Sequence, residues 1–311
     1  MGLVLRSIFA DIFNFFFRPK RYGASATLGM RDIYHALFRF IFSSEVQRRS
    51  RLDSENSAEA LFALPNKEGY LKITPYLDKN LRDEVLAECR KICSETLTPE
   101  YLKKFENAPF ASIPINRDLN RKNPFLRFAL QPGLIKALTR YFGIVPVIEG
   151  IYIWYSPNKV NLSNSSQFYH LDGQDVKTVQ LFLFIEDVGP ENGPLIFVEA
   201  ERSVEIAKEI GYRKTKRLKR IDDALIKSMT TPNQVVQATG PAGECYAVDT
   251  DRCLHYGSRM ATKPRYTVIF QYYTPFAFAL PWRWWTKLPF ADAGRAAEFN
   301  PLEKAVMGAK D

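Results

Sequence analysis

Apolar residues change their spacing along the chain, and the change falls near residue 147. Upstream, Leu81, Val85 and Leu86 begin a helical pattern that predicts a helix over 81–93. A second helix is predicted over 132–142, where Gly143 ends it, and a short strand over 68–73. Downstream, short runs rich in Val, Ile, Tyr and Phe are separated by Gly, Pro and Asn, which predicts strands. These runs are VIEGIYIWY, TVQLFLFIEDV, PLIFVEA, GECYAV and RYTVIFQYY.

Several strands in succession, without a helix between each pair, are typical of an antiparallel sandwich or barrel rather than of a parallel sheet. The predicted fold class is therefore mainly β with flanking α-helices. A double-stranded β-helix, the cupin-like jelly roll, is the architecture that fits best.

The N-terminal residues 3–17, LVLRSIFADIFNFFF, predict an amphipathic helix, because Ser7, Asp11 and Asn14 share one narrow polar stripe. Two interpretations stay open. The helix packs onto the following domain, or it lies in a membrane interface, helped by the basic residues that follow it. Its charges do not fit a membrane span or the apolar core of a signal peptide.

The domain organisation follows from where the pattern breaks. Residues 44–58 are polar without clear periodicity and predict a linker or loop. We expect an N-terminal helical extension and linker at 1–58, a jelly-roll domain at 59–290 and a C-terminal tail at 291–311. A basic interruption at 208–220 is either a solvated helix or loop, or a lid whose cations guide an anionic substrate.

Charge and cysteine content indicate which partners and which cellular compartment to expect. The 43 basic and 34 acidic residues give a net charge of +9, which favours anionic partners without choosing among them. Four cysteines are too few for a disulfide scaffold in 311 residues, and no CxxC spacing occurs. Cys89 and Cys93 are expected to be neighbours on one helix face. A reducing cytoplasm fits best, with peripheral membrane attachment as the alternative.

The chain has three histidines, and two of them fit a metal site. In Tyr169-His170-Leu171-Asp172, an extended backbone places His170 and Asp172 on the same face. A distant imidazole, His255, would complete two histidines and one carboxylate, the donor set of non-haem iron(II) oxygenases. A His-x-Asp pattern is common by chance, so the prediction of a metal site depends on the surrounding sequence.

That surrounding sequence includes Arg265 and Thr267, ten and twelve residues after His255. Strand alternation directs both side chains to the same face. A guanidinium beside a hydroxyl is suited to bind the far carboxylate of a dicarboxylic cosubstrate.

The ordered elements EGYLKITPYLDKNL, YHLDGQ, LFLFIEDVGPENGPL, LHYGSR and KPRYTVIFQYY resemble phytanoyl-CoA dioxygenase-like proteins over roughly residues 62–275. The resemblance implies a jelly roll with Fe(II) held by His170, Asp172 and His255. It also implies 2-oxoglutarate anchored by Arg265, with Thr267 and Ser258 assisting.

Two segments depart from that family pattern. The chain has Val198-Glu199-Ala200-Glu201-Arg202 where a Pro-Gly-Ser-His segment is frequent, and it has Arg259 and Met260 in place of an Asn after the distal histidine. These departures affect the expected pocket rim and substrate. Because Asp172 is present, halogenase chemistry is disfavoured.

The function implied is an Fe(II)- and 2-oxoglutarate-dependent dioxygenase that uses O2 to hydroxylate an unactivated C–H and releases succinate. Its expected partner is a small-molecule or acyl-type substrate, anionic and amphiphilic, rather than a nucleic acid. One alternative is a basic, membrane-associating binding protein on a jelly-roll scaffold without a catalytic metal. Another is a cupin-type isomerase with a different metal, although such enzymes usually use more histidines.

Other polar and aromatic positions have weaker interpretations. Trp154 and Tyr152 share one strand face and are either core or pocket lining. Gln180 and Gln271 are candidates for hydrogen bonds to cosubstrate or substrate inside the barrel. His35 lies on the apolar face of a predicted helix and is expected to pack there. The stretch PWRWWTKLPF is expected to be a hydrophobic cap, with a membrane or entrance element as the alternative.

Overall fold

Two antiparallel sheets form the centre of the computed structural model, which describes residues 28–106, 108–157, 165–212, 220–259, 261–277 and 288–309. The larger sheet has six strands in the order β1-β7-β4-β9-β3-β2, and the smaller has three in the order β6-β5-β8. The strands are β1 (Tyr70–Lys72), β2 (Ala111–Pro114), β3 (Val147–Ser156), β4 (Thr178–Phe184), β5 (Leu195–Val198), β6 (Val235–Ala238), β7 (Cys245–Asp249), β8 (His255–Tyr256) and β9 (Arg265–Tyr273).

Strand alternation sorts the residues of the larger sheet between two apolar clusters. In β4, Leu181 and Leu183 join the cluster beneath the helices, whereas Phe182 and Phe184 point toward the smaller sheet. Strand β5 supplies Phe197 to the second cluster, so the two sheets pack face to face. This arrangement of antiparallel sheets with flanking helices confirms the predicted fold class.

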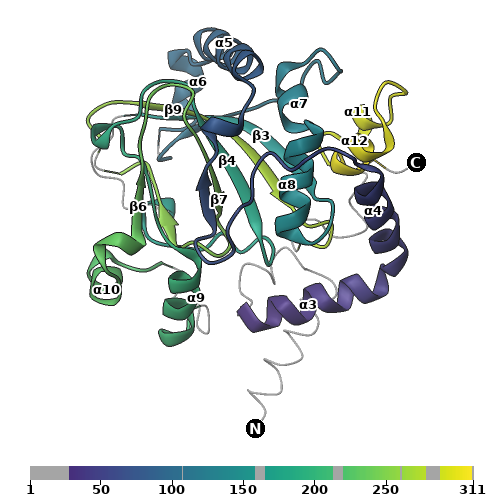
Figure 1. Ribbon diagram of the computed structural model, residues 1–311. Coiled ribbons are helices and arrows are strands. Elements are labelled where there is room, and N and C mark those ends of the chain that lie inside the picture. Colours follow the sequence, from purple (N-terminus) through teal and green to yellow (C-terminus); the bar gives the residue numbers. More distant parts are fainter. Residues whose placement is uncertain are drawn as a thin grey trace, which may run out of the picture.

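Helices cover the outer faces of both sheets (Figure 1). The larger sheet packs against α5 (Lys79–Thr96), α7 (Pro124–Ala129) and α8 (Pro132–Phe142), which contribute to the same core cluster. The smaller sheet carries α9 (Ala200–Glu209) and α10 (Asp223–Met229). The remaining helices are α3 (Leu28–Ile41), α4 (Ser43–Glu55), α6 (Pro99–Lys103), α11 (Ala291–Gly294) and α12 (Pro301–Val306).

The two helices predicted from apolar spacing are present; α5 extends two to three residues beyond its predicted range at each end, and α8 has the predicted bounds. Helix α5 begins after Asp78, whose carboxylate accepts the Leu81 N–H at 2.7 Å. Helix α8 ends at Gly143, which has a left-handed φ of 71° that glycine adopts without strain. Cys89 is buried and Cys93 partly buried on one face of α5, and neither forms a disulfide, as expected.

The predicted linker at 44–58 is wrong over most of its length, because residues 43–55 form helix α4. The reason is tertiary. Arg49 is only 1% exposed, and its guanidinium donates to Val145 O, Pro146 O and Ala305 O. A polar sequence thus makes its helix contacts through an arginine rather than through an apolar stripe.

The C-terminal residues, expected as a tail, include α11 and α12, and Phe299, Val306 and Met307 lie in the main core cluster. The short strands β2, β6 and β8, of two to four residues each, were not predicted. The division of the chain into three parts stays a prediction.

Three predicted features fall wholly or largely outside the described residues: the helix at 3–17, most of the basic segment 208–220, and most of PWRWWTKLPF. Within the described ranges, no helix is long and apolar enough to cross a bilayer.

Candidate metal centre

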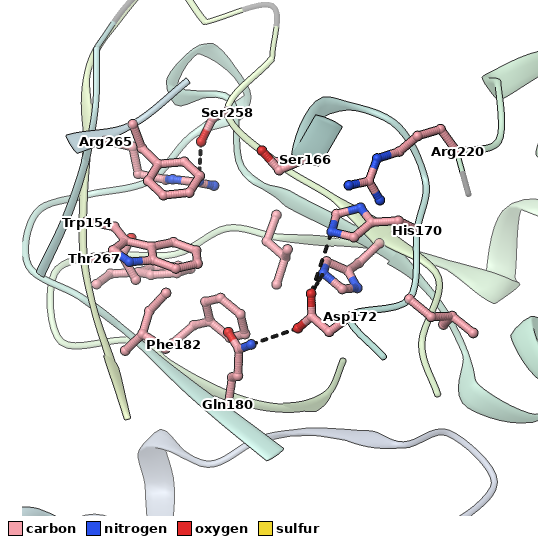
Figure 2. A pocket seen from close by; sticks show the side chains of 17 residues that line it. Trp154, Ser166, His170, Asp172, Gln180, Phe182, Arg220, Ser258, Arg265 and Thr267 are labelled. Carbon is pink, nitrogen blue, oxygen red and sulfur yellow. Dashed lines mark hydrogen bonds and ion pairs between the residues drawn. The ribbon is translucent and has the colours of Figure 1, made fainter. Parts of the chain in front are cut away.

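A cavity of about 370 Å³ lies between the two sheets and contains the candidate site (Figure 2). Its walls combine aromatic and aliphatic side chains with a few converging polar groups, as is typical of a small-molecule site. The lining residues include Phe110, Trp154, Phe182, Phe184, Leu195 and Ile269 among the apolar ones, and His170, Asp172, Gln180, Arg220, His255, Ser258, Arg265 and Thr267 among the polar ones.

His170 and His255 are brought together by their backbones, although 85 residues separate them in the sequence. They form an antiparallel bridge in which each N–H donates to the other's carbonyl at 3.0 Å. Residue 255 also begins β8 and pairs with Phe197 of β5. Two residues on, the Asp172 N–H donates to Thr250 O at 3.1 Å, so the extended geometry expected for 170–172 is present.

Three potential ligand atoms from His170, Asp172 and His255 lie within 4.8 Å of one another. Asp172 Oδ1 is 3.6 Å from the Nε2 atom of each histidine. The two histidines are each 7% exposed, and their ring centroids are 4.3 Å apart. Among the described residues, this is the single group of three or more His, Cys, Asp or Glu side chains with such geometry.

Neighbouring carbonyls orient both imidazoles. His170 Nδ1 lies 2.8 Å from Phe168 O, and His255 Nδ1 lies 2.9 Å from Cys253 O. Since a carbonyl can only accept, we assign the ring proton to Nδ1, which leaves the Nε2 lone pair facing Asp172. Gln180 Nε2 donates to Asp172 Oδ2 at 2.9 Å, so Oδ1 is the oxygen directed at the histidines.

This donor set fits a divalent transition metal with open coordination positions. Two imidazole nitrogens and one carboxylate oxygen are the ligands of non-haem Fe(II) sites, and three such donor atoms converge here. A polar cluster that tight, largely shielded from water, is costly unless a cation or protons occupy it.

The second polar region of the cavity contains Arg265, Ser258 and Thr267. Arg265 is 9% exposed and donates to Ser258 Oγ at 2.9 Å. Burial lowers the pKa of Arg265 to about 10. No carboxylate lies within ion-pair distance of this guanidinium among the described residues. The Thr267 hydroxyl is buried and has no hydrogen-bond partner among the described residues.

Ser258 holds an unusual backbone conformation beside this guanidinium. Its φ of 59° lies in the left-handed region, which costs a non-glycine residue roughly 1–2 kcal/mol. Ser258 N donates to Gly193 O at 3.1 Å, and Ser258 O accepts from Gln167 at 2.7 Å. These contacts hold the hydroxyl where it meets both Arg265 and Ser156 Oγ. Such strain is frequent at functional sites.

The structure brings all six predicted site residues to the lining of one cavity. The residues with weaker interpretations have different positions relative to the cavity. Trp154 lines the cavity, stacked on Phe110 with 4.5 Å between ring centroids, whereas Tyr152 donates to Glu149 at 3.1 Å and is not part of the lining. Gln180 holds Asp172, and Gln271 donates to Gln174 Oε1 at 3.0 Å.

His35 is not part of the ligand cluster. Its ring packs against Phe276 at 6.0 Å, and burial lowers the pKa of His35 to about 4. It is a packed helix residue, as expected.

Arg220, one of the cations of the predicted basic segment 208–220, lines the cavity. Its neighbour Ile221 is buried and donates its N–H to Tyr169 O at 3.0 Å, which places residue 220 beside the His170 segment. Of the cations in 208–220, only Lys208 and Arg220 are described, and only Arg220 lines the cavity.

Solved structures with similar folds include non-haem enzymes. The alpha-ketoglutarate-dependent epimerase SnoN from nogalamycin biosynthesis is 18% identical, with 68% of this chain and 80% of that chain covered and a TM-score of 0.45. EctD from S. alaskensis, solved with 2-oxoglutarate and 5-hydroxyectoine, is 12% identical, with 70% and 78% covered and a TM-score of 0.49. AviO1 from Streptomyces viridochromogenes is 16% identical, with 68% and 92% covered and a TM-score of 0.43.

No protein-family model matches the chain, and no curated protein matches it. The likeness to these solved structures is one of fold alone, and the His-x-Asp and distal His pattern is present in this chain at His170, Asp172 and His255.

Proposed function

We propose that the protein is an Fe(II)- and 2-oxoglutarate-dependent dioxygenase that hydroxylates an unactivated C–H of a small-molecule or acyl-type substrate. One observation carries the proposal: two oriented imidazoles and one carboxylate converge in the same cavity as a buried arginine that has no carboxylate partner among the described residues. A metal site alone fits many enzymes. A metal site paired with an anchor for a dicarboxylate fits this class.

His170, Asp172 and His255 would hold the metal, which when bound supplies activation of O2 coupled to oxidative decarboxylation of 2-oxoglutarate to succinate. Arg265 would grip the far carboxylate of 2-oxoglutarate, and the Thr267 and Ser258 hydroxyls would complete its hydrogen bonds. Gln180 would keep Asp172 Oδ2 occupied so that Oδ1 stays directed at the histidines.

The remaining cavity wall favours an amphiphilic, anionic substrate. Phe110, Trp154, Phe182, Phe184 and Leu195 offer an apolar surface to its body. Arg220 offers a cation to its head group, and in Figure 2 Arg220 and Arg265 lie on opposite sides of the view, with His170 nearer to Arg220. Two separated cations allow cosubstrate and substrate to be held at once.

The test loads purified protein anaerobically with Fe(II) and 2-oxoglutarate and follows the weak visible charge-transfer band of the chelate. We expect the band in the wild type and its loss in His170→Ala. His35→Phe is the matched control, since it removes the one histidine outside the cluster and should keep the band.

A well-folded wild type that shows no band overturns the proposal and favours the metal-free binding protein. A band that survives in His170→Ala would move the metal away from this cluster.

A further inference from the structure

Asp251 is a buried carboxylate beside the metal cluster that takes no part in it. It is 1% exposed and accepts backbone N–H groups from three consecutive residues, Gly173, Gln174 and Asp175. The Gln174 N–H lies 3.1 Å from Oδ1, and the Asp175 N–H lies 2.8 Å from Oδ2. Thr178 Oγ1 adds a hydrogen bond to Oδ2 at 2.5 Å. Asp251 is therefore surrounded by donors and works as an anchor for backbone.

The anchored loop is the one that directly follows the candidate ligand Asp172. Its first residue, Gly173, has a φ of 79°, which lets the chain turn sharply after the ligand. On the other strand, Thr250 O accepts the Asp172 N–H at 3.1 Å. Residues 250 and 251 together hold the backbone of Asp172 and of the turn behind it, and so set where the Asp172 carboxylate points.

The counter-ion of Asp251 comes from helix α3, outside the two sheets. Arg31 NH1 lies 3.3 Å from Asp251 Oδ1, and the two side chains are 2% and 0% exposed. Burial raises the pKa of Asp251, and the Arg31 charge opposes that rise. Because an ionised carboxylate at this depth needs a compensating charge, the cation on α3 favours the charged acceptor that the loop requires.

We propose that Arg31 is a positioning residue of the metal centre: it supports Asp251, which anchors residues 173–175 and thereby orients Asp172. The inference rests on the proposed metal-binding function. If so, helix α3 helps to position the metal ligands and is not a separate extension. Arg31 and Asp251 are 220 residues apart in the sequence.

The chain provides a matched control in Arg49 of α4. Both arginines are 1% exposed, both come from the N-terminal helices, and both pair with a carboxylate. The partners of Arg49 are Glu45 and three carbonyls at residues 145, 146 and 305, and among the described residues none of them is hydrogen-bonded to residues 172–175. A loss of stability alone would therefore affect the two variants alike.

The experiment compares Arg31→Gln, Arg31→Lys and Arg49→Gln with the wild type in the full-length protein. Binding of Co(II) alone is followed by its visible absorption, and amide exchange at residues 173–175 is followed by mass spectrometry. We expect Arg31→Gln to weaken Co(II) binding about 10-fold or more, the range found for the supporting partners of metal ligands. Exchange at 173–175 should accelerate. Arg31→Lys should restore much of the Co(II) affinity and of the protection from exchange. Arg49→Gln should change neither the Co(II) affinity nor the exchange at 173–175.

Wild-type Co(II) affinity and exchange in Arg31→Gln would overturn the inference, as would equal losses in Arg31→Gln and Arg49→Gln. If Arg31→Gln does not fold, Thr178→Val removes one donor from Asp251 and is expected to weaken Co(II) binding in the same direction. A wild type that binds no Co(II) contradicts the proposed metal site, whereas the exchange measurement still decides whether Arg31 holds the loop.

Discussion

Two buried arginines on different sides of the molecule, Arg49 and Arg265, differ in how many hydrogen bonds the protein makes to their guanidinium groups. Arg49, between α4 and the C-terminal helix α12, bonds to Glu45 at 2.6 Å and to the carbonyls of residues 145, 146 and 305. Arg265, in the cavity, has a single hydrogen bond from its guanidinium, to Ser258 Oγ at 2.9 Å, among the described residues. Four hydrogen bonds to protein acceptors use most of the donors of the first guanidinium, whereas the second has most of its donors left for a ligand.

The difference teaches how a buried charge can be assigned to structure or to function. A cation that the protein satisfies completely stabilises the fold, because breaking such a pair leaves an uncompensated charge. A cation left short of acceptors beside a cavity costs stability until a ligand supplies them. The comparison therefore makes different predictions for the two sites.

The largest effect is expected at Arg49. Arg49→Ala leaves Glu45 without this partner and removes the guanidinium donors of three carbonyls, so the free energy of unfolding should fall by about 3–5 kcal/mol. Urea unfolding at fixed pH measures it, and the 2-oxoglutarate requirement of the folded fraction should stay at the wild-type value. A change in that requirement would break the comparison.

The second effect is expected at Arg265. Arg265→Ala removes the charge-assisted contacts to the cosubstrate carboxylate, worth roughly 2–3 kcal/mol, so the 2-oxoglutarate concentration needed for the charge-transfer band should rise on the order of 100-fold. Unfolding by urea should change far less than in Arg49→Ala. A large loss of stability with an unchanged 2-oxoglutarate requirement would assign Arg265 to structure.

A smaller effect is expected at Thr267, whose buried hydroxyl has no protein partner in the described part of the chain. Thr267→Val keeps the shape and removes the donor, so 2-oxoglutarate binding should weaken by about 1 kcal/mol, or roughly 5-fold. Stability should not fall, because no protein hydrogen bond is lost there. Titration of the same band measures the change, and an unaltered titration would remove Thr267 from the anchor.

The smallest effect is expected at Arg220, an exposed arginine that extends the comparison to the cavity mouth. Arg220→Gln should weaken binding of decanoate by a few-fold, since exposed ion pairs contribute roughly 0.2–1 kcal/mol. Binding of decanol should not change, and neither should the 2-oxoglutarate titration. Calorimetry on the wild type and the variant measures both ligands, and equal losses for decanoate and decanol would contradict an anion-binding role.

The sequence by itself determined most of the strands and the local geometry of the candidate site. Strand β9 was predictable from its β-branched and aromatic residues, and the shared face of Arg265 and Thr267 from the two-residue period. The same period placed His170 and Asp172 together. These features depend on neighbours a few residues apart, whose directions the backbone geometry sets locally.

Only the tertiary structure decided the contacts between distant segments. A polar stretch became helix α4 because Arg49 reaches carbonyls 96 to 256 residues away. The hydrogen bond from Gln180 to Asp172 was not predicted either, although contact of Gln180 with a ligand stays a prediction. Nothing in the sequence around Arg31 or around Asp251 predicts that the two side chains pair. The partner of a buried polar group is set by which segments the folded sheets bring together, and hydrophobic periodicity carries no information about that choice.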